Sequence, residues 1–188
     1  MTRAQGVPAP LVVVMGVSGC GKSTVGRLLA LRIRAEFLEG DELHPTRNVE
    51  RMAAGIPLTD NDRRQWLLEV AAQLADARAG QHGLVVSCSA LKRSYRDMLR
   101  AASSDIAFVH VSGNPELLES RMQARADHFM PPALFASQLQ ILEPPGPDER
   151  AATFDAATPA AEIADAAARW LANLTPAPTS KAKSKAKR

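Results

Sequence analysis

The sequence predicts an α/β protein: one three-layer α/β/α domain on a mostly parallel sheet of about five strands. Short apolar runs rich in β-branched residues alternate with longer stretches of helical periodicity, which is typical of strands joined by crossover helices. The run at 11–15 is apolar at every position, as expected of a strand covered on both faces. A glycine-rich turn separates this run from the first helical stretch. These observations favour a sheet buried between two layers of helices.

The expected strands are short and leave room for a helix between each pair. They lie at 11–15, 35–39, 83–88, 106–111 and 152–155. The stretch 41–80 is predicted to be helical, and either Thr59 or Asp60 can cap a helix within it. Gly80 is placed to end that helix.

The second half of the chain carries further helix signals. A helix is expected over 91–101, and another begins at Asn114 and Pro115, a capping residue followed by a first-turn proline. That helix should end near residue 124, and the polar stretch 125–132 is expected to be a loop. A further helix should then end near residue 143, and a last one should start at 158–159.

Length and composition predict a single globular domain. The chain has 188 residues, of which 46% are apolar and 23% are charged. We expect a flexible leader at 1–9, one compact domain at 10–174 and a disordered basic tail at 175–188. No apolar run reaches membrane-spanning length and the N-terminus lacks a signal core, so we expect a cytoplasmic protein without membrane contact. Two cysteines exclude a disulfide framework or a four-ligand zinc site.

The net charge of +3 comes from the tail. The last eight residues carry five of the 23 Lys and Arg side chains and no acid. Without them the balance is 18 basic against 20 acidic residues, or −2. The body of the protein is therefore not basic, and no nucleic acid partner is expected.

The run Gly16-Val-Ser-Gly-Cys-Gly-Lys-Ser23 matches the phosphate-binding pattern G-x-x-x-x-G-K-[ST] at every fixed position. It follows a predicted buried strand and opens a helix, which is the context that the motif requires. The glycines allow backbone N–H groups to converge on phosphate oxygens. Lys22 supplies a point charge to the β- and γ-phosphates, and Ser23 offers a hydroxyl to Mg²⁺. Cys20 occupies a free position of the loop, so it receives no catalytic role.

The remaining sequence narrows the class of nucleotide-binding protein. No Asn-Lys-x-Asp tetrapeptide occurs, which argues against a guanine-specific GTPase, and the chain is short for a motor. A small phosphotransferase is the favoured class. Asp41 follows the second predicted strand and should lie near the phosphates at the carboxyl edge of the sheet. It can orient or deprotonate an attacking hydroxyl, hold Mg²⁺ through water, or merely cap the following helix.

Several segments beyond the phosphate loop belong to a more specific pattern. They are Leu38-Glu-Gly-Asp-Glu-Leu-His-Pro45, Asn48, Met52, Gly55-Ile-Pro-Leu58, Asp60-Asn-Asp-Arg63, Trp66, Cys88-Ser-Ala-Leu-Lys92, Tyr95-Arg96-Asp97, Leu99-Arg100, His128-Phe-Met130 and Leu142-Glu-Pro144. With the phosphate loop, they make residues 10–172 resemble the gluconate kinases (gluconokinases), relatives of the shikimate and nucleoside-monophosphate kinases. Arg51 and Gln65 depart from the pattern, which often has lysine and proline there.

The resemblance implies a magnesium-dependent enzyme that transfers the γ-phosphoryl of ATP to the 6-hydroxyl of D-gluconate, giving 6-phospho-D-gluconate and ADP. It implies a P-loop kinase fold with a mobile lid at about 122–140. It also suggests a homodimer. Lys22, Asp41 and Arg125 are the implied catalytic residues, and Ser23 with Asp41, acting through water, would hold the metal.

The implied binding residues fall into two groups. The nucleotide group is Gly16, Val17, Ser18, Gly19, Cys20, Gly21, Lys22, Ser23, Thr24 and Arg121. The substrate group is Asp41, His44, Arg47, Arg51, Arg63, Ser89, Lys92 and His128. Gluconate needs a cation for its carboxylate and polar groups for its hydroxyls, and Arg63 is the first choice for the carboxylate. For each helical member of the substrate group, a solvated helix face remains the alternative.

Two other functions remain open at the level of sequence. The same fold can phosphorylate another acceptor, such as shikimate, a nucleoside monophosphate or a different sugar acid. A nucleotide-binding regulatory protein that uses its basic tail on nucleic acid is the alternative from another class.

Overall fold

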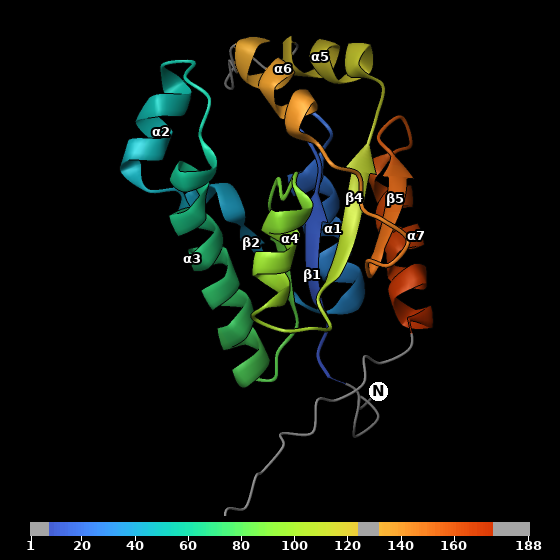
Figure 1. Cartoon of the computed structure of the whole chain (residues 1–188). Helices are drawn as coiled ribbons and strands as arrows, with labels where there is room; N and C mark the ends of the chain where they lie inside the picture. The colour runs from blue at the N-terminus through green and yellow to red at the C-terminus, as the bar shows by residue number, and fades with distance from the viewer. Residues whose placement is uncertain (1–7, 124–131, 175–188) are drawn as a thin grey trace, which may run out of the picture.

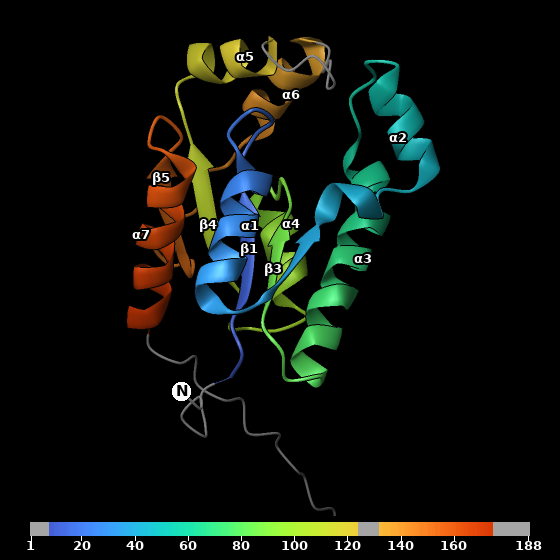
Figure 2. The same ribbon diagram turned by 180° about the vertical axis from the view of Figure 1, so that it is seen from behind.

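The computed structural model describes residues 8–123 and 132–174, and these form one parallel sheet between two layers of helices (Figures 1 and 2). The sheet has the strand order β2-β3-β1-β4-β5. The strands are β1 (Leu11–Met15), β2 (Glu36–Glu39), β3 (Leu84–Ser87), β4 (Ala107–Ser112) and β5 (Ala151–Asp155). All four strand pairs are parallel, so the predicted fold class is confirmed.

The helices connect the strands as crossovers or close the carboxyl edge of the sheet. They are α1 (Lys22–Ile33), the short 3₁₀ turn η1 (Gly40–Leu43), α2 (Thr46–Ala53), α3 (Asp60–Ala79), α4 (Arg93–Arg100), α5 (Pro115–Gln123), α6 (Pro132–Ile141) and α7 (Ala160–Asn173). Figure 1 shows α5 and α6 across the end of the sheet to which the strands point. Within the described residues, no helix has both the length and the hydropathy needed to cross a membrane.

Both faces of the central strand are buried, as its continuous apolar run predicts. Val12 and Val14 belong to a core with residues of α1 and α7. Leu11, Val13 and Met15 belong to a second core with residues of α3 and α4. Since successive side chains of a strand point to opposite faces, one apolar run serves two separate cores.

The predicted helix boundaries hold to within a few residues. The expected helical stretch 41–80 is divided into η1, α2 and α3. Thr59 is the cap of α3: its hydroxyl accepts from the Asp62 N–H at 3.2 Å, and the Asp62 carboxylate accepts from the Thr59 N–H at 2.9 Å. Gly80 ends the helix, as predicted. Asn114 accepts the N–H of Glu116 at 2.9 Å at the start of α5.

The ends of the predicted domain lie partly beyond the described residues. Ala9, expected in the leader, is 5% exposed, and its carbonyl accepts from Arg78 at 2.9 Å. Of the predicted lid, 122–123 lie in α5 and 132–140 lie in α6, where Leu134 and Phe135 are buried. The rest of that stretch and the predicted tail from residue 175 lie outside the described residues.

A buried ion pair joins α4 to the segment that enters β5. The side chains of Arg96 and Glu149 are each 1% exposed, and two guanidinium nitrogens donate to the two carboxylate oxygens at 2.7 Å. Arg96 also donates to the carbonyls of Ala90, Leu91 and Glu143 at 3.2, 3.3 and 2.9 Å. The pair therefore fixes the loop between β3 and α4, in which Ala90 adopts the left-handed region with φ of 43°.

We predict that Arg96→Met lowers the free energy of unfolding by about 3 kcal/mol, because the buried Glu149 carboxylate loses its bidentate partner and keeps only the bond from Arg100 at 2.8 Å as a charged contact. Urea denaturation followed by circular dichroism measures the effect. Arg93→Met is the matched control, because Arg93 lies on the same helix and pairs with Asp148 at the surface. An equal loss of unfolding free energy in the two variants would show that the buried pair contributes no more than the surface pair, which contradicts the prediction.

The same pair gives a stability change in acid. Hydrogen bonds from Arg96 lower the pKa of Glu149 from 4.5 to about 2. Because the folded pKa is the lower one, the stabilisation is complete above the unfolded pKa of 4.5 and is lost as the pH falls toward 2.

Candidate active site

The phosphate loop between β1 and α1 requires its glycines for two different reasons. Gly16 and Gly19 have φ of 140° and 81°, and a Cβ there would stand 2.4 Å from the Val111 carbonyl and 2.7 Å from that of Leu118. Gly21, with φ of 97°, caps α1, and a Cβ there would meet nothing within 4 Å. The first two glycines are thus required by close packing as well as by backbone conformation, and the third by conformation alone.

Two donors of this loop are satisfied by oxygen atoms of the protein itself. The Lys22 ammonium donates to the carbonyl of Val17 at 3.0 Å. The Ser18 N–H donates to Oε1 of Gln138, on α6, at 2.7 Å. Ser23 lies in the first turn of α1, directly after Lys22. The loop lies at the N-terminus of α1, where the helix dipole favours anions, and this position suits the predicted binding of phosphate.

The turn that carries Asp41 is held in place at Gly40. The Gly40 N–H donates to the Ser87 hydroxyl at 3.3 Å, and its carbonyl accepts from the Trp66 indole at 2.7 Å. A Cβ on Gly40 would stand 2.2 Å from the Ser87 carbonyl, so only glycine fits here. Asp41 follows at the carboxyl end of β2 and is exposed.

Cys88 lies directly after β3, and its side chain is fully buried. Burial raises the pKa of Cys88 to about 12, the charge of Asp41 adds to this rise, and the charge of Lys22 opposes it. Both charges therefore act on one sulfur atom at the end of β3. The thiol stays protonated and does not serve as a nucleophile.

His44 is held as a neutral ring beside Asp41. It stacks on Trp66 with ring centroids 4.1 Å apart and an angle of 16° between the planes. Its Nδ1 lies 3.4 Å from the side-chain nitrogen of Asn48. Burial, followed by the charge of Arg63, lowers the pKa of His44 to about 4. At neutral pH this ring can donate or accept a hydrogen bond without carrying charge.

Two cations lie over the ring of Tyr95, and one of them, Arg63, also acts on His44 through its charge. Arg63 of α3 and Lys92 of the β3–α4 loop lie 6.0 and 5.6 Å from the ring centroid. Lys92 donates to both oxygens of Asp60 at 2.8 Å, and the Tyr95 hydroxyl donates to Asp60 at 2.5 Å. The bonds from Lys92, then Tyr95, lower the pKa of Asp60. His44, Asp60, Arg63, Lys92 and Tyr95 are called the acceptor cluster below.

The family of the chain follows from its relatives. A family described as an AAA domain matches residues 11–145. The gluconokinase of Gluconobacter oxydans is 50% identical over 144 residues, covering 77% of this chain and 81% of the relative. The thermoresistant gluconokinase of Escherichia coli is 44% identical, covering 74% of this chain and 79% of the relative.

The chain belongs to the gluconokinase family. A solved gluconokinase structure from Sinorhizobium meliloti is 47% identical, with a TM-score of 0.79 over 87% of this chain and 91% of that one. The shikimate kinase of Aquifex aeolicus shares the fold alone, at 18% identity and a TM-score of 0.54. The resemblance that the sequence motifs indicated is therefore confirmed.

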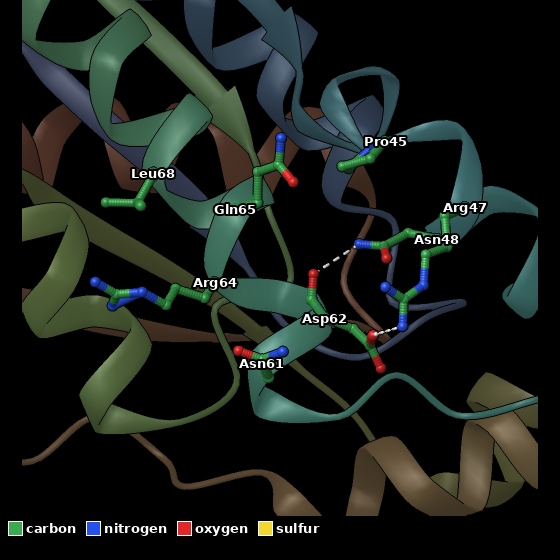
Figure 3. Close-up of a pocket in the computed structure, with 8 residues that line it drawn as sticks. All are labelled: Pro45, Arg47, Asn48, Asn61, Asp62, Arg64, Gln65 and Leu68. Carbon is green, nitrogen blue, oxygen red and sulfur yellow. Dashed lines mark hydrogen bonds and ion pairs between the residues drawn. The ribbon is translucent and has the colours of Figure 1, made fainter.

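Within this gluconokinase-family chain, two arginines of the predicted substrate group lie apart from the acceptor cluster. Arg47 and Arg51 of α2 approach the Asp62 carboxylate at 3.3 and 3.7 Å. Arg47 and Asp62 line a cavity of about 340 Å³ between α2 and α3, together with Pro45, Asn48, Asn61, Arg64, Gln65 and Leu68 (Figure 3). On α3, residues 61, 64, 65 and 68 line the cavity, whereas Arg63 of the same helix belongs to the acceptor cluster.

Of the other predicted site residues, the structure describes Ser89 and Arg121. Ser89 follows β3, and its carbonyl accepts the N–H of Gly16 at 3.3 Å, which ties the acceptor side to the phosphate loop. Arg121 lies in the last turn of α5. Arg125 and His128 lie outside the described residues. Sequence reasoning gave no site role to Asp60, Tyr95 or Gln138; the first two stood in recognised motifs, but nothing in the sequence singled out Gln138.

The residues near the loop suit a magnesium ion whose remaining ligands come from water and the nucleotide. No group of three metal-ligating side chains occurs in the described part of the chain. Mg²⁺ commonly needs only one or two protein oxygens, because water and nucleotide phosphates supply the others. Ser23 at the start of α1 and Asp41 after β2 offer a hydroxyl and a carboxylate, the hard oxygen ligands that this ion prefers.

We predict that the ring protons of His44 show no titration in NMR spectra between pH 8 and pH 5.5, and titrate near the folded pKa of about 4. Burial and the neighbouring guanidinium both disfavour the imidazolium. Arg63→Met removes one of these two causes and should move the midpoint upward. A midpoint near 6.5 in the wild-type protein would contradict the placement of this ring.

Proposed function

We propose that this protein transfers the γ-phosphoryl group of ATP to the 6-hydroxyl of D-gluconate, giving 6-phospho-D-gluconate and ADP. Its membership in the gluconokinase family supports this reaction over the shikimate or regulatory alternatives. The observation that carries the proposal is the position of Asp41 and His44 in the turn that follows β2. In this parallel sheet, that turn and the phosphate loop after β1 both leave the carboxyl edge.

ATP and Mg²⁺ are the proposed cofactors. Lys22 and the loop N–H groups bind the phosphates, and Ser23 with water held by Asp41 contributes to the metal site. The metal, when bound, neutralises charge on the β- and γ-phosphates. Arg121 and Arg125 are proposed to contact the nucleotide and the transferring group.

Asp41 is proposed to position the attacking hydroxyl and to accept its proton. Phosphoryl transfer depends mainly on in-line positioning and charge neutralisation, so a fixed carboxylate beside the cradle is well suited to it. The pinned Gly40 turn supports this role, because it limits the freedom of the residue that follows.

The acceptor cluster is proposed to recognise the acid. Arg63 and Lys92 supply cations for the carboxylate, and a guanidinium can bind it through two parallel hydrogen bonds. The neutral ring of His44 can bind a hydroxyl without competing for the carboxylate. Ser89 and His128 are retained as further contacts, while Arg47 and Arg51 support the acceptor side through Asp62. We also propose a cytoplasmic homodimer, on the family resemblance.

We predict that Lys22→Ala abolishes phosphoryl transfer while the circular dichroism spectrum stays unchanged. Asp41→Asn should lower kcat by about 10²–10⁴-fold with little change in ATP affinity, since a general base acts in the transition state. Coupled ADP-release assays and calorimetric titration with ATP measure the two effects. Glu42→Gln, at the exposed neighbouring position of the same turn, is the matched control. If Asp41→Asn changes only gluconate affinity, the base role is wrong.

We predict that Arg63→Met raises the KM for gluconate at least about tenfold and leaves the KM for ATP unchanged, because a charged hydrogen-bond partner of the carboxylate is lost. Arg64→Met is the matched control, since this neighbour faces the cavity between α2 and α3. A panel of acceptors that includes shikimate and other sugar acids tests the choice of substrate in the same assay. Preference for another acceptor would overturn the proposed specificity.

A further inference from the structure

One N–H donor of the phosphate loop has its acceptor in a distant part of the chain. Gln138 is separated by 120 residues from Ser18, yet its Oε1 accepts the Ser18 N–H at 2.7 Å. That distance is short for an N–H···O bond, and Ser18 belongs to the run that matches the phosphate-binding pattern. The Ser18 N–H therefore donates to a neutral amide oxygen, although it belongs to a loop whose motif binds anions.

The packing of α6 holds this amide in position. Phe135, one turn before Gln138, is 6% exposed and belongs to the core that includes Val17 and Cys20 of the loop. Leu134 is 5% exposed. Because these apolar contacts anchor the helix, the amide is presented to the loop without depending on its own hydrogen bond. The Lys22 ammonium is satisfied in the same manner by the Val17 carbonyl.

We propose that Gln138 sets the nucleotide affinity by competing with the phosphate groups of ATP for the Ser18 N–H. Backbone N–H groups of such loops converge on phosphate oxygens, and a single N–H cannot make a short linear bond to two acceptors. The Gln138 amide is therefore released when nucleotide enters, and the bond that it loses subtracts from the binding energy. This inference rests on the proposed binding of ATP at the loop.

The test compares Gln138→Leu with Gln138→Glu by calorimetric titration of ATP with Mg²⁺. Leucine removes the competing acceptor at similar volume, and one neutral hydrogen bond corresponds to a decrease in Kd of about two- to tenfold. Glutamate supplies a stronger acceptor and a negative charge next to the phosphates, so the Kd should rise at least about tenfold. Gln140→Leu and Gln140→Glu, at an exposed position of the same helix, should stay within about twofold of the wild type.

A second measurement separates competition from a purely structural contact. Without nucleotide, Gln138→Leu should have a lower Tm than the wild type, because its Ser18 bond is missing. At saturating ATP the two values should coincide, since neither protein makes that bond when nucleotide is bound. A contact that persists in both states would lower the Tm equally with and without ATP.

Unchanged or weaker ATP binding by Gln138→Leu would overturn the proposal, as would a Tm difference that saturating ATP leaves intact. The wild-type protein and Lys22→Ala distinguish this failure from that of the proposed function. If the wild type binds no ATP, nucleotide binding at the loop is wrong. If the wild type binds ATP, Lys22→Ala does not, and Gln138→Leu matches the wild type, only the competition is wrong.

Discussion

The architecture depends on the close approach of the phosphate loop to its neighbours. Gly16 packs against the Val111 carbonyl at the end of β4, and Gly19 packs against the Leu118 carbonyl in α5. Neither position has room for a Cβ, so the loop can lie at this depth only as glycine. The Gly16 N–H also donates to the Ser89 carbonyl after β3 at 3.3 Å. The loop is therefore joined to the segment after β3 as well as to β4 and α5.

The local arrangement of charge matters more than the net charge. The chain without its last eight residues carries −2, although it is proposed to bind two anions. Its cations near the site are held by specific partners. Lys92 is bound to Asp60, and Lys22 to a backbone carbonyl. Each ammonium is thus oriented by an oxygen of the protein and keeps at least one further donor for a ligand oxygen. The electrostatic attraction is then local and selective for groups of the right shape.

Much of the fold could be predicted from the sequence because its signals are local. The apolar run at 11–15, the Thr59 cap and the motif ending in Ser23 each depend on residues that are adjacent or three to four positions apart. The family resemblance also indicated Asp41, His44, Arg63 and Lys92, but it could not tell which cations lie together. Arg47 and Arg51 have the same charge as Arg63, and only their ion pairs with Asp62 in the folded chain distinguish them. The bond from Ser18 to Gln138 spans 120 positions, so no periodicity or spacing could indicate it.

Trp66 joins the two halves of the acceptor side, since its indole bonds the Gly40 carbonyl and its ring stacks on His44. The chain has two tryptophans, and the other, Trp170, lies in α7 against the opposite face of the sheet. A buried indole is sensitive to the polarity and quenching groups around it. Trp66 is therefore an intrinsic fluorophore within the acceptor side, and its emission reports the environment of His44 and the Asp41 turn without any added label.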